Sequence, residues 1–173
     1  MTFFILIALA ILALLGYAAS RPDDFSVSRV TSIKAAPERI FPLINDLRAM
    51  NSWNPFVLSD PKVKLSYSGP ATGKGATCDW DSNGRAGAGQ IGISESVPSS
   101  RVVMQLDMRK PFAGRNQVTF TLAPADGATS VTWAMTGKNA FIPKLMSLVM
   151  NMDKMVGGAF EKGLADLKAK AER

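Results

Sequence analysis

Glu95 is the side chain in this sequence that is best suited to acid–base chemistry. It shares strand parity with the apolar residues Ile91 and Ile93, so strict alternation would point its carboxylate toward the core. Loss of solvation there would favour the protonated acid and let Glu95 donate or accept a proton on a bound molecule. A β-bulge, which Gly89 or Gly92 makes plausible, would turn the side chain outward instead. We expect the outward position, at the rim of any site.

Few other residues could carry catalysis. The chain contains no histidine and one cysteine, Cys78, which excludes an intramolecular disulfide, a Cys/His metal site and a histidine-activated nucleophile. Cys78 lies in an alternating apolar segment and is expected to be a small core residue. Tyr67 could donate a hydrogen bond to a reacting group or simply pack in its strand. We therefore expect no metal or cofactor, and a binding protein rather than an enzyme.

The charge pattern does not indicate a nucleic-acid partner. The chain has 20 Lys and Arg residues against 14 Asp and Glu residues, a net charge of +6, and the positive residues are scattered among acidic ones. Such a surface could contact anionic lipid head groups or could simply be solvated.

Residues 1–20 contain no charged side chain and are almost wholly apolar. As a helix, this stretch would be roughly 29 Å long, close to the roughly 30 Å hydrocarbon thickness of a bilayer. It predicts a transmembrane anchor; the alternative is a cleaved secretory signal, which would leave a periplasmic or secreted domain. Basic residues follow the segment and none precedes it, so the positive-inside rule places the domain in the cytoplasm of a single-pass membrane protein, on the basis of Arg21, Arg29, Lys34 and Arg39.

The remaining sequence predicts one α+β domain over residues 25–173, after a short linker at 21–24. A strand is expected at 25–34, followed by short helices that start near Pro37 and are interrupted at Pro42. From residue 62 the apolar period becomes two, which predicts six antiparallel strands joined by hairpins. A long amphipathic helix, weakened at Gly157 and Gly158, is expected from residue 142 to about residue 170. This order is that of a helix-grip fold, in which a curved antiparallel sheet wraps a C-terminal helix.

A series of short motifs supports this interpretation. In their order and spacing they resemble the polyketide cyclase/dehydrase and lipid-transport branch of the START-like, pollen-allergen-like superfamily (SRPBCC). The motifs are WNPF at 53–56, DP at 60–61, YSG at 67–69, GKGA at 73–76, Trp80, ESVP at 95–98, TSVTW at 129–133 and FEKGLADLK at 160–168. The resemblance implies a cavity between sheet and helix that holds an apolar ligand. It does not imply cyclase chemistry, because one fold supports many functions.

Methionines on the facing surfaces agree with an adaptable pocket, although they could equally fill an ordinary core. They are Met104, Met108, Met135, Met146, Met152 and Met155. The expected ligand-binding residues are Trp53, Tyr67, Trp80, Glu95, Met104, Met135, Met152 and Phe160, with the tryptophans and Glu95 near the mouth. The predicted function is a membrane-anchored binding domain for a hydrophobic small molecule or lipid. Two alternatives stay open: a cyclase- or dehydrase-like enzyme that uses Glu95 as acid or base, and a partner-binding protein without a ligand.

Overall fold

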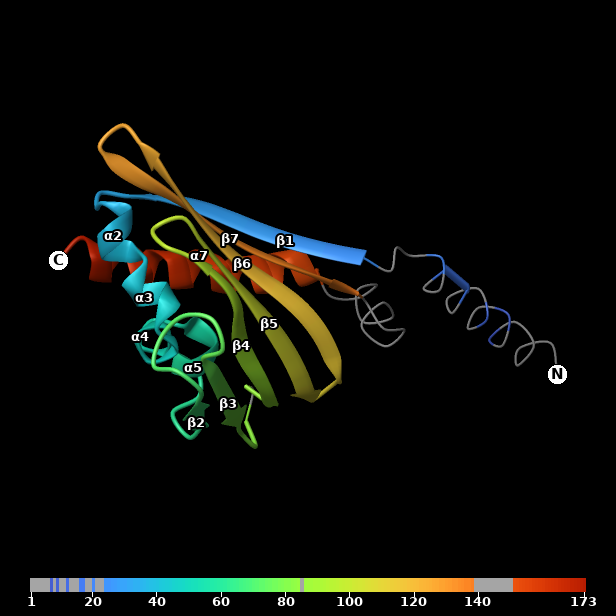
Figure 1. Cartoon of the computed structure of the whole chain (residues 1–173). Helices are drawn as coiled ribbons and strands as arrows, with labels where there is room; N and C mark the ends of the chain where they lie inside the picture. The colour runs from blue at the N-terminus through green and yellow to red at the C-terminus, as the bar shows by residue number, and fades with distance from the viewer. Residues whose placement is uncertain are drawn as a thin grey trace.

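A curved antiparallel sheet and a long C-terminal helix form the domain, as Figure 1 shows for the computed structural model. The structure describes residues 24–84, 86–138 and 151–173, together with positions 7, 9, 12, 16, 17 and 20. Within these residues the strands are β1 (Asp24–Ile33), β2 (Lys64–Ser68), β3 (Thr77–Asp81), β4 (Ala88–Val97), β5 (Arg101–Lys110), β6 (Gly114–Ala125) and β7 (Ala128–Lys138). The helices are α2 (Pro37–Ile40), α3 (Pro42–Asn45), α4 (Leu47–Asn51), α5 (Pro55–Leu58) and α7 (Met152–Ala171).

The sheet is a meander closed by the first strand. Its order is β1-β7-β6-β5-β4-β3-β2, and each neighbouring pair is antiparallel. Consecutive strands from β2 to β7 are therefore neighbours, as the short hairpin connections expected from the sequence predict. β1 adds to the outer edge of β7, which brings the start of the domain beside its last strand.

Short helices cover one end of the sheet, and their limits follow from local sequence signals. Pro37, Pro42 and Pro55 each occupy the first turn of a helix, where a missing backbone N–H costs nothing. Asp46 caps α4 by accepting a hydrogen bond from the Arg48 amide at 2.8 Å. The helical region expected from the sequence after Pro37 is thus divided into four short helices, α2 to α5, which bury apolar side chains toward the sheet.

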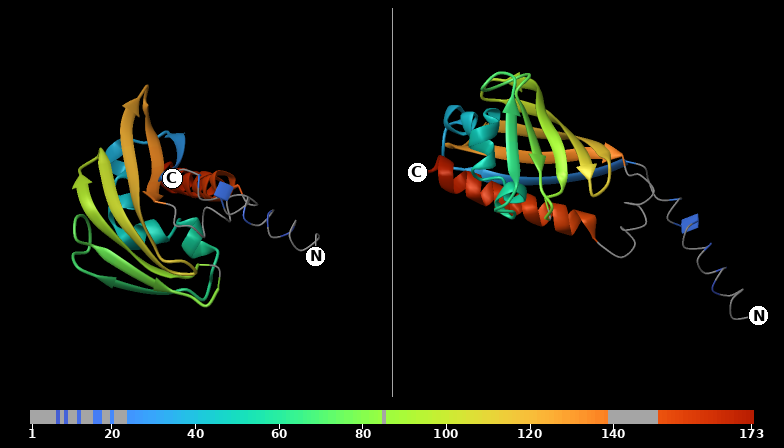
Figure 2. Two further views of the ribbon diagram at one scale, coloured as in Figure 1. Left: turned by 90° about the vertical axis from the view of Figure 1, so that its right-hand side faces the viewer. Right: turned by 90° about the horizontal axis from the view of Figure 1, so that it is seen from below.

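α7 lies along β1, on the same side of the curled sheet as the short helices (Figure 2). Arg29 on β1 pairs with Asp153 at 3.0 Å and with Glu161 at 2.7 Å. Gly157 makes room for this guanidinium, since a Cβ at that position would lie 2.0 Å from an Arg29 nitrogen. The helix expected from residue 142 is described from Met152 onward, and residues 139–150 lie outside the described part of the chain.

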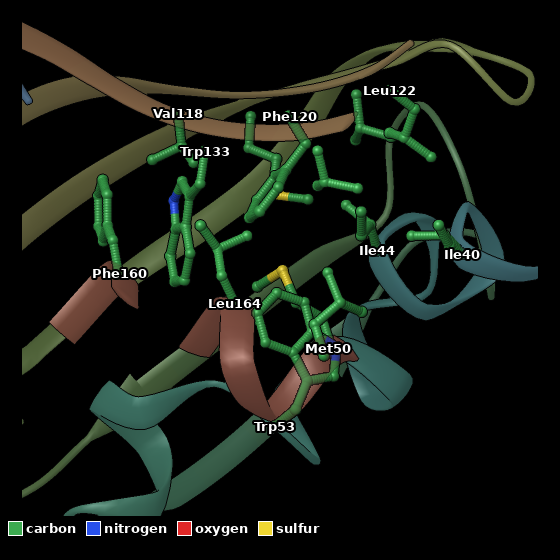
Figure 3. Close-up of a cluster of buried hydrophobic side chains, with 14 of the residues drawn as sticks. Ile40, Ile44, Met50, Trp53, Val118, Phe120, Leu122, Trp133, Phe160 and Leu164 are labelled. Carbon is green, nitrogen blue, oxygen red and sulfur yellow. The ribbon is translucent and has the colours of Figure 1, made fainter. Parts of the chain in front are cut away.

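The core is built around four aromatic side chains from distant parts of the chain (Figure 3). Trp53, which is fully buried, meets Phe120 and Trp133 edge-on at centroid distances of 6.0 and 5.7 Å. Trp133 stacks on Phe160 of α7 at 4.1 Å with an interplanar angle of 9°. Aromatic pairs of this kind contribute about 0.5–1.5 kcal/mol beyond the area they bury. They join α7, the sheet and the short helices into one unit.

The predicted transmembrane anchor requires correction. In the described portion of the chain, no helix is both long enough and apolar enough to cross a bilayer. Residues 1–20 are described only at six scattered helical or turn positions, and apolar composition alone does not fix one continuous spanning helix. The same finding contradicts the prediction of a single-pass membrane protein with a cytoplasmic domain, because that prediction depends on a spanning helix. The cleaved-signal alternative concerns residues 1–20, most of which lie outside the described part.

Candidate functional site

A cavity of about 310 Å³ lies between the sheet and the helices α4, α5 and α7. The sheet register explains much of the cavity wall. One row of residues lies side by side across β3, β4, β5 and β6, and every member of this row lines the cavity: Cys78, Ile91, Leu106 and Asn116. The helices add mostly apolar side chains, including Phe56, Val57, Val156 and Phe160. The volume is at the lower end of the roughly 300–1,000 Å³ found for small-molecule sites.

The lining carries no formal charge among the residues described. It includes no Asp, Glu, Lys or Arg side chain. An ionic ligand group would therefore lose its hydration without gaining a counter-charge from this wall, which is costly in a low-dielectric site. The cavity suits an uncharged, largely apolar molecule.

Polar groups gather where α4 meets β2 and β3. The Nδ2 of Asn51 donates to the Tyr67 hydroxyl at 3.1 Å and lies 3.4 Å from the Cys78 sulfur. The Nδ2 of Asn54 donates to the side-chain oxygen Oδ1 of Asn51 at 3.3 Å, and the Arg48 guanidinium lies 4.1 Å from the centre of the Tyr67 ring. Burial raises the pKa of both the Cys78 thiol and the Tyr67 hydroxyl, so both are neutral at physiological pH. This cluster supplies hydrogen-bonding groups rather than a nucleophile.

Trp80 forms another part of the wall because its strand partner is a glycine. Trp80 pairs with Gly89, and a Cβ on that glycine would come within 2.4 Å of the indole ring. The indole lies over this gap and donates its N–H to the Ala86 carbonyl at 2.9 Å. The ring face is thus available to the cavity while its polar atom is satisfied by the protein.

Three of the eight residues proposed from sequence line the cavity: Trp80, Met135 and Phe160. Trp53 and Met104 are fully buried in the core and do not belong to the lining. The Trp53 N–H donates to the Leu43 carbonyl at 2.9 Å.

The other proposed residues lie elsewhere. Tyr67 is not a lining residue, but its hydroxyl accepts a hydrogen bond from Asn51, which is one. Met146 and the side chain of Met152 lie outside the described part of the chain. Of the other methionines, Met108 lines the cavity and Met155 is exposed. A role in ligand binding stays a prediction for all of them.

Glu95 lies outward because β4 contains a bulge. Ile93 pairs with Met104 and Glu95 pairs with Val103, so Ser94 is the extra residue that reverses the parity. The Glu95 carboxylate accepts a hydrogen bond from Arg101 Nε at 3.1 Å and is about half exposed. It is not part of the cavity wall.

Asn51, Asn54 and Cys78 are residues of the site that sequence reasoning did not select. Asn54 belongs to the WNPF motif, where its side chain accepts a hydrogen bond from the Phe56 amide and starts α5. That motif was therefore an available signal for this part of the wall. Nothing in the local pattern of Asn51 indicates that α4 turns it toward β2 and β3.

Solved structures of similar fold span nearly the same length. A crystal structure of a protein from Chromobacterium violaceum shares 19% identity, covers 88% of this chain and 99% of its own, and superposes with a TM-score of 0.61. The Aha1 dimer from Colwellia psychrerythraea shares 19% identity, covers 86% of this chain and 96% of its own, with a TM-score of 0.60. A protein from Mesorhizobium loti shares 15% identity, covers 86% of this chain and 98% of its own, with a TM-score of 0.62.

At these identities the likeness establishes the fold and leaves function open. A search of curated proteins found no match. The family comparison is more specific, because one family profile matches residues 24–172, which is nearly the whole domain described above. The chain therefore belongs to the polyketide cyclase / dehydrase and lipid transport family, within the helix-grip superfamily that its sequence resembles.

Proposed function

We propose that this chain binds an uncharged hydrophobic small molecule or lipid in the cavity between the sheet and α7. The observation that carries the proposal is the cavity itself, with about 310 Å³ of space inside a wall of mainly apolar side chains. Removing apolar surface from water contributes roughly 25 cal/mol per Å². Ligand burial here therefore needs few specific contacts. Family membership agrees with this activity.

Acid–base catalysis by Glu95 receives no support from the geometry. Its carboxylate is paired with Arg101 on the outer side of a bulge, whereas a general base must come within about 3 Å of the proton it removes. We therefore propose binding rather than reaction.

A filling substitution tests the proposal. Leu106→Trp places a large ring in the middle of the lining row, whereas Gln117→Trp places the same ring on an exposed position of β6. Titration with the uncharged dye N-phenyl-1-naphthylamine, whose emission rises in apolar sites, is expected to give saturable binding to the wild type. Leu106→Trp should weaken it at least about tenfold, a change of ~1.4 kcal/mol, and Gln117→Trp should leave it within about twofold.

Thermal melts of the two variants separate filling from damage. If open space exists at Leu106, its Trp variant melts close to the wild type; a packed core would instead lose about 1–3 kcal/mol through overpacking. A wild type that binds no dye would contradict the proposal and favour a partner-binding protein without a ligand. Unchanged dye affinity in Leu106→Trp would show that the dye binds elsewhere.

A further inference from the structure

The indole N–H of Trp133 is a buried donor without a hydrogen-bond acceptor. Trp133 is 5% exposed, and among the described residues its Nε1 is the buried side-chain nitrogen or oxygen that has no partner. The other two indoles are satisfied within the protein, Trp53 by the Leu43 carbonyl and Trp80 by the Ala86 carbonyl. Folded proteins rarely leave such a donor unpaired, so this one requires an explanation.

Trp133 lies in the cavity wall, which supplies that explanation. Its ring stacks on Phe160, and the neighbouring lining residues Val118 and Met135 offer carbon atoms and a weakly accepting thioether. In Figure 3 the indole nitrogen lies on the edge of the ring that is turned away from Trp53. No residue in the described part of the chain therefore accepts a hydrogen bond from this edge of the ring.

We propose that the Trp133 N–H donates a hydrogen bond to an oxygen of the bound molecule, an inference that rests on the proposed binding function. The acceptor is neutral, because the described lining provides no cation to balance a carboxylate or a phosphate. The ligand class is then an apolar molecule with a carbonyl, ether or hydroxyl oxygen near β7. A pure hydrocarbon of the same size binds with lower affinity, because it leaves the Trp133 N–H without an acceptor.

Access to this nitrogen requires a small rearrangement. The Nε1 atom is buried and has no access to the open space of the cavity, so an incoming oxygen reaches it only after a neighbouring group moves. Met135 lines the same cavity, is partly buried, and has an unbranched, flexible side chain, so we expect it to be the lining residue that moves.

Two probes of the same skeleton test the inference on the 173-residue chain. They are 1-(2-naphthyl)heptan-1-one and 2-heptylnaphthalene, in which a carbonyl is replaced by a methylene, and each displaces N-phenyl-1-naphthylamine in competition. Trp133→Phe keeps an aromatic ring but removes the N–H. Trp80→Phe is the matched control, since Trp80 also lines the cavity but donates to Ala86.

The measured quantity is the ratio of the two affinities, which cancels general effects of each variant on the cavity. We expect Trp133→Phe to lower the affinity for the ketone about fivefold relative to the alkane, the equivalent of ~1 kcal/mol, and Trp80→Phe to leave the ratio unchanged. In the wild type, the Trp133 indole proton resonance should shift downfield with the ketone and not with the alkane. That measurement decides the matter if Trp133→Phe fails to fold, with the resonance assigned from Trp53→Phe and Trp80→Phe.

The outcomes separate the two proposals. If both probes bind and Trp133→Phe leaves their ratio unchanged, or the wild-type resonance does not respond to the ketone, the hydrogen bond is refuted while the binding function stands. If neither probe binds, the binding function is refuted, and this inference with it.

Discussion

Two glycines of α7 provide a direct test of how closely this helix approaches the sheet. Gly158 is exposed and a Cβ there would meet nothing within 4 Å, whereas a Cβ at Gly163 would lie 2.7 Å from a Trp133 ring carbon and 2.8 Å from the Cδ of Pro55. Replacing glycine by alanine in a helix interior gains about 1 kcal/mol of helix propensity at either position. Only Gly163→Ala also overpacks the core, at a cost of about 1–3 kcal/mol.

The propensity gain is common to both variants, so their difference isolates the packing cost. We expect Gly158→Ala to stabilise the protein by about 1 kcal/mol and Gly163→Ala to be about 1–3 kcal/mol less stable than Gly158→Ala. Urea unfolding followed by circular dichroism gives both free energies, provided that the m-value is unchanged. Equal stability of the two variants would refute the reasoning, because it would mean that α7 does not lie against Trp133 and Pro55 at this distance.

The remaining predictions concern two buried ionisable side chains. A hydrogen bond from Ser82 lowers the pKa of Asp60 below its ordinary 3.8, so the stabilisation that its charge provides is complete above about pH 4 and is lost as the pH falls through the lower folded-state pKa. The unfolding free energies of the wild type and Asp60→Asn should therefore differ most above pH 5 and come closer together as the pH falls below about 4; a constant difference would contradict the role of the charge. Burial raises the pKa of Cys78, so its thiol should react with 5,5′-dithiobis(2-nitrobenzoate) far more slowly in the folded than in the urea-unfolded chain, and more slowly still with N-phenyl-1-naphthylamine bound. Equal rates in the folded and unfolded chain would contradict the burial of this residue in the cavity wall.

The sheet was predictable because each strand buries one face. In β5 the apolar residues Val102 and Met104 alternate with Val103 and Gln105, and the structure buries the first pair fully. Such a pattern depends only on local backbone geometry, so it could be recognised in one sequence. The register that places Glu95 outward also depends on how β4 pairs with β5 at Ser94, and no local signal specifies that residue.

The cavity lining was less predictable because strand parity specifies a face and not a depth. Met104 and Met108 lie on the same face of β5, yet Met104 is fully buried in the core and Met108 lines the cavity. The difference depends on where α4, α5 and α7 cover the curved sheet, which involves contacts between residues far apart in sequence. The prediction from the apolar character of residues 1–20 was also limited to local information, since composition alone does not establish a continuous spanning helix.

The arrangement of the aromatic side chains explains how a small domain can keep an open space beside a close-packed core. Trp53 is fully buried, donates a hydrogen bond to the Leu43 carbonyl, and packs edge-on against Trp133, which holds the short helices against the sheet. Phe160 of α7 stacks on the Trp133 ring. We expect these rigid rings to hold the helices in place beside the cavity. A cluster of flexible aliphatic side chains in the same position could instead collapse into the open space. The unpaired indole N–H belongs to the same residue, Trp133, so the aromatic packing fixes the position of a buried hydrogen-bond donor beside an apolar wall. In the proposed binding mode, a donor held in this way would select among apolar molecules by the position of one oxygen.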